Sequence, residues 1–173
     1  ENARRIAQAL GISLTELRVV ILDKPRHLEL VRDLRAAGAR VSTPTAGDVA
    51  GALAAVLDDG DADVLMGIGG TPEGVMTACA VRALGGGMQA RLAPQRDDEI
   101  RALADAGVDL DATLSLDDLA PGPALFAAAG VTSGLVPAPV PEDDHLRVHT
   151  ILVTAGKVSR ASAVVPNYQP PEN

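Results

Sequence analysis

Aromatic residues are almost missing from this chain of 173 residues, which has one Phe, one Tyr and no Trp. Hydrophobic residues still make up 47% of the sequence, which excludes a disordered chain and means that the core is built from Ala, Val, Leu and Ile. Small aliphatic side chains allow helices to pack closely on a parallel sheet that is covered on both faces. The composition therefore favours one layered α/β domain or large subdomain.

Cysteine, long apolar runs and positive charge are also scarce. The single cysteine, Cys79, excludes an internal disulfide and is typical of a reducing compartment, so we expect a cytoplasmic protein. No apolar run approaches the roughly 20 residues of a membrane span, and no signal peptide is visible, so we expect no membrane partner. The formal net charge of −8 argues against nucleic acid as a partner, because a phosphate backbone requires a basic face. A small phosphorylated ligand needs only a few local cations and is not excluded.

Short apolar runs alternate with helix-like segments over most of the chain. This alternation is typical of an α/β protein with a layered, mostly parallel sheet and flanking helices. Glycines and prolines punctuate most of the boundaries. The predicted strands are 18–22, 40–43, 63–66, 88–92 and 124–129, and the predicted helices are 2–10, 27–37, 48–57, 72–84 and 94–106.

The last part of the chain has a different pattern. Segments 145–154 and 157–165 flank Ala155-Gly156 and predict a C-terminal antiparallel hairpin. The residues that follow are polar and rich in proline. We therefore expect one α/β subdomain over residues 1–165 and a flexible tail over residues 166–173.

Ligands of open parallel sheets bind beyond the carboxyl ends of the strands, and two predicted strand ends carry suggestive residues. After the first strand, Lys24 and Arg26 flank Pro25, and such cations commonly hold phosphate oxygens. The alternative is an ordinary solvated loop. After the second strand, Gly47-Asp48 opens a helix whose amides are suited to an anion, although Asp48 at this position is also typical of a helix cap.

The third predicted strand end is the glycine loop, residues 67–74, which follows a strand and opens a helix. Gly70 permits close approach of the backbone to a ligand, Thr71 is suited to the N-cap and Pro72 to the first helical position. Glu73 then lies in the first turn, where it either binds a divalent cation or simply complements the helix dipole. The spacing fits neither a dinucleotide-binding fingerprint nor a Walker A loop.

Taken in order, these segments and three later ones resemble the second half of the class II fructose-1,6-bisphosphatases. Each motif is modest by itself, and the shared order and spacing over about residues 2–163 make the resemblance specific. The segments concerned are 22–27, 46–51, 66–74, 84–92, 116–119 and 126–134.

The resemblance implies a lithium-sensitive, metal-dependent sugar phosphatase whose fold is an α/β/α/β/α sandwich, with this chain as its C-terminal subdomain. It implies hydrolysis of fructose 1,6-bisphosphate to fructose 6-phosphate in gluconeogenesis, and in some members hydrolysis of sedoheptulose 1,7-bisphosphate, with Mg²⁺ or Mn²⁺ as cofactor. It implies that Glu73 is a metal ligand. The implied substrate contacts are Lys24, Pro25, Arg26, Gly47, Asp48 and Gly70.

Two departures from the family's pattern are visible. The other metal ligands of the family lie in its N-terminal half, so we expect this chain to need that half of the same protein and to be inactive alone. The helix-like start at Glu1 agrees with a preceding segment, and we also expect a homo-oligomer. In addition, Ala46, Ala129 and Ser133 replace the family's usual Asp, Thr and Asp.

These departures keep several alternatives open. One is a phosphatase paralogue acting on another phosphorylated sugar or cyclitol. Another is a phosphosugar-binding or regulatory module that keeps the phosphate clamp and has lost the chemistry. A third is a nucleotide-binding domain of the Rossmann type.

Overall fold

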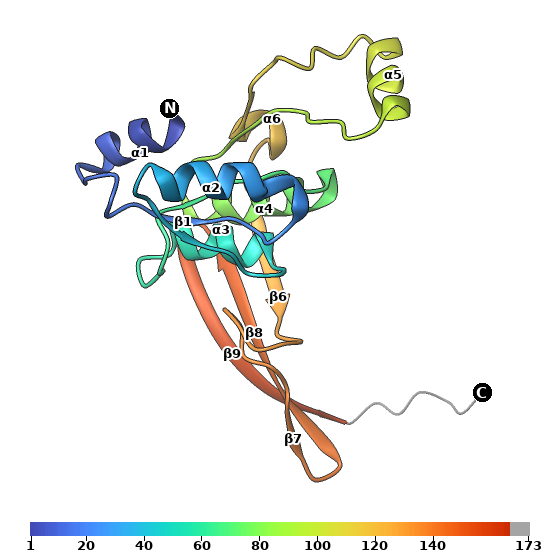
Figure 1. Ribbon diagram of the computed structural model, residues 1–173. Helices are drawn as coiled ribbons and strands as arrows, with labels where there is room; N and C mark the ends of the chain where they lie inside the picture. The colour runs from blue at the N-terminus through green and yellow to red at the C-terminus, as the bar shows by residue number, and fades with distance from the viewer. Residues whose placement is uncertain (167–173) are drawn as a thin grey trace.

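A computed structural model describes residues 1–166 of the chain. Its centre is a parallel sheet of three strands, β1 (Arg18–Val20), β2 (Arg40–Ser42) and β3 (Val64–Leu65), in the order β2-β1-β3 (Figure 1). Because β1 lies in the middle, the loop that follows it lies between the loops that follow β2 and β3.

Helices cover both faces of the parallel sheet. On one face, α1 (Asn2–Leu10) and α2 (Leu28–Ala36) bury their apolar stripes against Val19 and Ile21 of the central strand segment. On the other face lies α3 (Asp48–Val56), and α4 (Thr71–Leu84) packs against α3. The approach of α3 is close, since a Cβ on Gly51 would lie 2.9 Å from Cγ1 of Val20.

A second sheet, here called the hairpin sheet, lies beyond α4. It contains β6 (Leu125–Ala129), β7 (Val140–Glu142), β8 (His145–Thr154) and β9 (Lys157–Pro166), all antiparallel to their neighbours. Strand β8 pairs with β6 and β7 on one edge and with β9 on the other. Ala83 of α4 packs on Ile151 and Val153, so the layers run helix, parallel sheet, helix, hairpin sheet.

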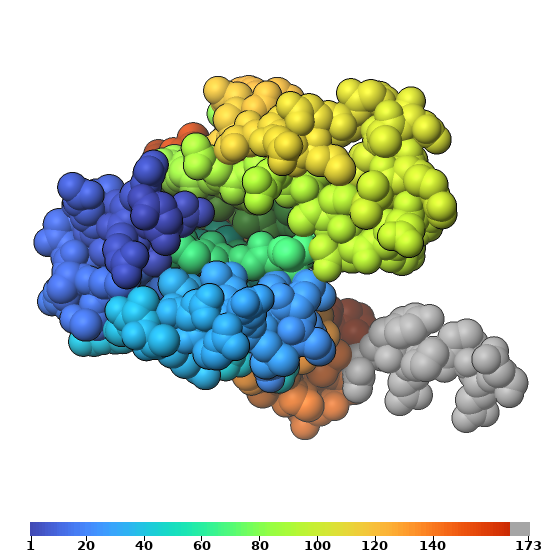
Figure 2. All heavy atoms as spheres, turned by 45° about the horizontal axis from the view of Figure 1, so that its top comes forward, coloured from blue at the N-terminus to red at the C-terminus, as the bar shows by residue number. Residues whose placement is uncertain are grey.

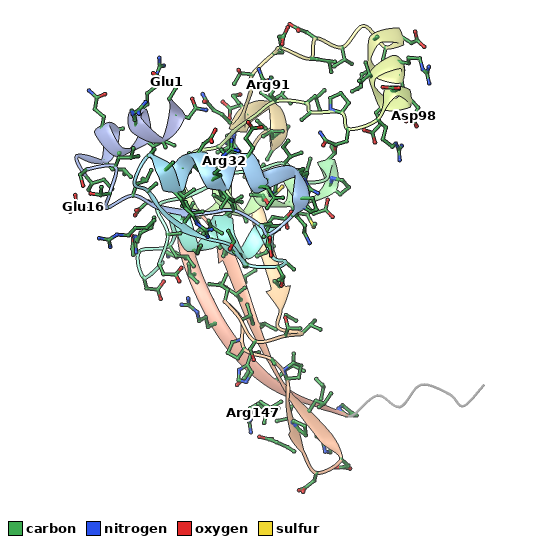
Figure 3. The ribbon with its side chains drawn as sticks, viewed as in Figure 1. Glu1, Glu16, Arg32, Arg91, Asp98 and Arg147 are labelled. Atoms are coloured by element: carbon green, nitrogen blue, oxygen red, sulfur yellow. The ribbon has the colours of Figure 1, made fainter. Side chains whose placement is uncertain are left out.

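The far end of the hairpin sheet extends away from the helices (Figure 1). Arg147 lies on this part, near the turn between β7 and β8 (Figure 3). Its guanidinium donates two hydrogen bonds to the carboxylate of Glu142, at 2.6 and 2.9 Å. This ion pair ties the short strand β7 to β8.

The segment between α4 and β6 is the least compact part. β4 (Gln89–Ala90) and β5 (Leu114–Ser115) form a separate antiparallel ladder, and a capping box formed by Ser115 and Asp118 starts α6 (Leu116–Leu119). Between β4 and β5, α5 (Asp97–Asp105) has no buried residue and lies away from both the parallel sheet and the hairpin sheet (Figure 1). In the space-filling view the same region lies at one end of the molecule (Figure 2).

The α/β fold class and the C-terminal hairpin are confirmed. The predicted strands 88–92 and 124–129 are present as β4 and β6, but both lie outside the parallel sheet. Strands β5 and β7 were not predicted. Pro166 ends β9 rather than starting the predicted tail, and residues 167–173 of that tail lie outside the described residues. Within residues 1–166, no helix is both long and apolar enough to cross a membrane.

One ion pair joins the starts of β1 and β3. Asp63 accepts hydrogen bonds from the backbone amide of Arg18 at 2.7 Å and from its guanidinium Nη2 at 2.7 Å. Hydrogen bonding to the Arg18 side chain, followed by the bond from its amide, lowers the pKa of the Asp63 carboxyl. Because the folded state favours the ionised carboxylate, this contribution to stability is present at neutral pH and is lost in acid as Asp63 is protonated.

We therefore predict that Asp63→Asn is less stable than the wild type at neutral pH and loses less further stability between about pH 6 and about pH 3. Denaturant unfolding followed by circular dichroism at each pH measures this difference. Asp58→Asn, an exposed change in the same α3–β3 connection, is the control and should keep the wild-type slope. Equal acid slopes for Asp63→Asn and the wild type would contradict the assignment.

Candidate functional site

The three loops that follow the parallel strands meet at one edge of the sheet. The backbone amide of Asp23, after β1, donates to the carbonyl of Pro44, after β2, at 2.8 Å. Nζ of Lys24 donates to the carbonyl of Thr45, also at 2.8 Å. These two bonds hold the β1 and β2 loops together.

A buried histidine holds the β1 loop to the glycine loop after β3. Pro25 starts a short 3-10 helix, η1 (Pro25–His27), whose last residue His27 is only 3% exposed. Nδ1 of His27 lies 2.8 Å from the carbonyl oxygen of Leu22, and Nε2 lies 2.8 Å from the amide of Ile68. Since the amide of Ile68 can only donate, Nε2 is the acceptor and Nδ1 carries the proton of a neutral ring.

The same peptide segment is also held by Arg26, whose Nε donates to the carbonyl of Ile68 at 2.8 Å. This bond uses one N–H of the guanidinium, and Arg26 is an exposed residue. Its two Nη groups make no hydrogen bond to another group within residues 1–166. Gly67 packs on the imidazole with a φ of +151°, and a Cβ there would lie 3.0 Å from Cε1 of His27. The conformation therefore favours glycine at this position, and any larger residue would press on the imidazole ring.

The glycine loop then leads into α4. Gly70 is the N-cap, and Thr71 and Pro72 are the first two helical residues, so the prediction of Thr71 as N-cap was wrong by one position. Glu73 lies half-buried in the first turn, and its Oε2 is folded back against Gly70, where a Cβ would collide with it. The carboxylate of Glu73 thus lies beside Gly70 at the sheet edge.

The β2 loop contributes the start of α3. Gly47 is the N-cap with a φ of +95°, and Asp48 is the first helical residue. The side chain of Asp48 makes no N-cap bond; it only accepts from the next amide, that of Val49, at 3.2 Å. Oδ2 of Asp48 would lie 3.1 Å from a Cβ on Gly69, so this carboxylate lies beside the glycine loop.

The edge of the parallel sheet thus brings together two cations, Lys24 and Arg26, two carboxylates, Asp48 and Glu73, and the amino ends of α3 and α4. Helix amino ends and cations both favour a bound anion. Within residues 1–166, no group of three or more His, Cys, Asp or Glu side chains is arranged to hold a metal ion. The site therefore has the chemistry of an anion cradle with carboxylates at its rim.

A hollow of about 240 Å³ lies elsewhere, at the opposite edge of the parallel sheet. It is lined in part by Arg18, Arg40 and Asp61. The candidate site is instead an open surface formed by loops.

Comparison with known proteins agrees with this geometry. The family model described as bacterial fructose-1,6-bisphosphatase, glpX-encoded, matches residues 1–164. The chain belongs to the class II fructose-1,6-bisphosphatase family. This confirms the resemblance that the motifs indicate.

Three curated relatives support membership of the family. The class 2 fructose-1,6-bisphosphatase of Haemophilus influenzae is 43% identical over a match that covers 78% of this chain and 44% of the relative. Two cyanobacterial proteins named D-fructose 1,6-bisphosphatase class 2/sedoheptulose 1,7-bisphosphatase cover the same 78% of this chain and 43% of their own length. They come from Trichodesmium erythraeum, at 38% identity, and a Synechococcus species, at 39%. The match thus spans less than half the length of these bisphosphatases, and the chain as a whole is about half as long as they are.

All seven residues predicted from the family resemblance lie at the three loops of this edge. Their roles as substrate contacts and metal ligand stay predictions. His27, which joins two of the loops, was missed as a site residue because its spacing to other histidines fits no metal site. The sequence nevertheless contained a signal for this role. A histidine directly after the basic turn must either be exposed to solvent or, if buried, form hydrogen bonds with both ring nitrogens. The seven residues are Lys24, Pro25, Arg26, Gly47, Asp48, Gly70 and Glu73.

We predict that Gly67→Ala destabilises the chain by about 1 kcal/mol or more, because alanine at this φ is strained and its Cβ presses on His27. Thermal unfolding measures the change. Gly87→Ala is the matched control, since a Cβ at Gly87 meets no atom within 4 Å. Equal melting temperatures for the two variants would show that the close packing of Gly67 on His27 is not required.

Proposed function

We propose that this chain binds a sugar bisphosphate, fructose 1,6-bisphosphate, and takes part in its hydrolysis to fructose 6-phosphate. The observation that carries the proposal is the convergence of Lys24, Arg26 and two helix amino ends at one sheet edge. A bisphosphate has two dianionic ends, and this arrangement is suited to holding one of them. The names of the two cyanobacterial relatives support sedoheptulose 1,7-bisphosphate as a second substrate.

Under this proposal the cations bind the phosphate that does not react. Arg26 keeps both Nη groups for a bidentate contact while its Nε is fixed to the carbonyl of Ile68. Lys24 adds a point charge from the β1–β2 side, where its own bond to Thr45 holds it. Fixing the distal phosphate positions the rest of the substrate, which is a large part of phosphoryl-transfer catalysis.

Glu73 is the proposed ligand for Mg²⁺ or Mn²⁺, both of which prefer carboxylate oxygens. Such an ion, when bound, polarises the scissile phosphate and activates water. One carboxylate with Asp48 beside the same loop does not make a complete site, and no three-ligand group exists within residues 1–166. The remaining ligands are therefore proposed to come from the part of the family's length that this chain does not span.

The hairpin sheet has a surface on which that part is proposed to pack. The outer face of this sheet is the face turned away from α4. Residues that lie directly opposite each other on antiparallel strands share a face, so Ala127 and its partner Leu152 lie on the outer face, as do Ala129 and its partner Thr150. Leu152 and Leu125 on this face are 39% and 60% exposed, whereas Ile151 and Val153 on the opposite face are buried. Natural sheets rarely leave such an apolar face uncovered.

Strand β9 offers an open edge beside the same face. It is ten residues long and pairs with β8 on one side, and no other strand of residues 1–166 pairs with its second side. Its only charged residues are Lys157 and Arg160, both near its start. Because long edge strands are normally protected by charge or by cover, and because the relatives are more than twice as long as their match, we assign this surface to their remaining length.

A phosphosugar-binding or regulatory module is the second candidate. The lack of a metal-holding group in the described residues favours it for this chain taken alone. Both candidate functions use the same anion cradle. They differ only in whether the bound phosphosugar is hydrolysed.

The test of the proposed function compares Glu73→Gln with Glu99→Gln in the gene product that contains this chain. Both changes remove a carboxylate from the third position of a helix, so their effects on the helix dipole are matched. We predict that Glu73→Gln lowers Mn²⁺-dependent phosphate release from fructose 1,6-bisphosphate by about a hundredfold or more, as expected for loss of a group that supports the transition state. Glu99→Gln should keep the wild-type rate.

Two results would change this assignment. Wild-type turnover by Glu73→Gln would show that Glu73 is not a metal ligand. Binding of fructose 1,6-bisphosphate by calorimetry, with no phosphate release by the wild type under any divalent cation, would favour the binding module.

For the packing surface, we predict that Leu152→Lys leaves this chain folded by circular dichroism but lowers the melting temperature of the longer gene product by several degrees. An apolar side chain buried there contributes about 1.5–3 kcal/mol, which a lysine would forfeit. Leu10→Lys, at an exposed position of α1, is the control. If this chain instead forms a dimer that Leu152→Lys dissociates, the surface belongs to a second copy and the assignment fails.

A further inference from the structure

We infer that His27 is a positioning residue, which sets the glycine loop in the conformation that presents Gly70 and Glu73. The functional part of this inference rests on the proposed function, because those two residues are the proposed substrate contact and metal ligand. The structural part rests on the bonds of one imidazole alone.

The first step is the way in which the glycine loop is attached. The backbone ladder between β1 and β3 ends with the bond from the amide of Met66 to the carbonyl of Val20, at 3.0 Å. Beyond that bond, the connections from the glycine loop back to the β1 side within the described residues are those of His27 and Arg26. Both of them go to Ile68, one residue before Gly69.

The second step is that Ile68 is held at both of its backbone polar atoms. Nε2 of His27 accepts from its amide and Nε of Arg26 donates to its carbonyl, each at 2.8 Å. One bond therefore anchors the peptide group before Ile68, and the other anchors the peptide group after it. With both peptide groups anchored, the direction in which the chain enters Gly69, Gly70 and α4 is set.

The third step is that an imidazole ring is suited to making both bonds at once. At its other nitrogen it donates to the carbonyl of Leu22, at the carboxyl end of β1, so one ring joins two neighbouring strand ends. The ring is 3% exposed and Gly67 packs against it, so water cannot replace either bond without moving the loop. A side chain here must be a donor and an acceptor about as far apart as the two ring nitrogens.

The test uses two variants of nearly matched size. His27→Phe keeps an aromatic ring but can neither donate nor accept. His27→Gln keeps both functions, because its amide group can donate to the carbonyl of Leu22 and accept from the amide of Ile68.

Amide hydrogen exchange, measured by NMR on this chain, reports on the loop directly. We expect the amide of Ile68 to exchange about tenfold faster or more in His27→Phe, because its buried acceptor is lost, and to regain protection in His27→Gln. The amide of Ile151 in the hairpin sheet should be unchanged, which separates a local effect from global destabilisation. A ¹⁵N spectrum of the wild-type histidines should show His27 neutral, with the proton on Nδ1, and needs no variant.

The inference is overturned if Ile68 is as protected in His27→Phe as in the wild type, or if Nε2 of His27 carries the proton. If His27→Phe does not fold, two other measurements test the inference. Protection of the Ile68 amide in His27→Gln and a proton on Nδ1 in the wild-type ¹⁵N spectrum support it, and loss of that protection or a proton on Nε2 overturns it.

In the longer gene product, kcat/KM for fructose 1,6-bisphosphate should fall in His27→Phe and recover in His27→Gln, in parallel with Ile68 protection. If the Ile68 amide exchanges faster in His27→Phe but the wild type shows no turnover, the proposed function is refuted, while the structural role of His27 in positioning the loop is supported. Turnover that is unaffected by a large change in exchange would refute the positioning role in catalysis.

Discussion

The imidazole of His27 donates to the carbonyl of Leu22 and accepts from the amide of Ile68, and the geometry of the candidate site depends on this pair of bonds. The parallel ladder alone holds β1 and β3 side by side only as far as Met66. Beyond it, a loop rich in glycine has little to restrain it, since glycine adds backbone freedom. A single buried ring with a donor on one side and an acceptor on the other supplies the restraint, and Gly67 gives it the space.

Much of the scaffold could be predicted from local sequence, because the patterns involved span only a few neighbouring residues. The run around Val19 has the composition of a buried strand, and parallel strands end at one edge, so the convergence of the basic turn with Glu73 followed from topology alone. Pairings between distant segments could not be predicted. The acceptor of the Ile68 amide lies 41 positions away, and β6 pairs with β8 instead of joining the parallel sheet. The N-cap of α4 was misplaced by one residue because Gly70 and Thr71 both suit it.

The charge distribution is compatible with the proposed binding of an anion by a chain whose net charge is −8. The acidic side chains are spread over the surface, for example at the start of α5, which lies away from both sheets. At the carboxyl edge of the parallel sheet, Lys24 and Arg26 are held by backbone carbonyls, and two helix amino ends point to the same side. Over distances of a few ångströms these local groups act more strongly than the screened field of remote carboxylates. Asp48 and Glu73, at the same edge, offset part of the positive charge. The same edge holds too few carboxylates to bind a metal ion. For this reason we propose that the remaining metal ligands come from the part of the family's length that this chain does not span.

The loop after β2 is where we expect this chain to depart from its family's pattern within the site. The family resemblance predicts an Asp where Ala46 stands, directly before Gly47, and Asp48 is the one carboxylate in residues 43–48. A site that bonds a substrate hydroxyl with a buried polar group rejects analogues that lack it, and loss of such a group relaxes that selection. Removal of a carboxylate beside the amino end of α3 also lowers the repulsion of a phosphate there. Under the proposed function, both effects would therefore favour binding of a phosphorylated sugar and leave recognition of its hydroxyl groups in this loop to Asp48.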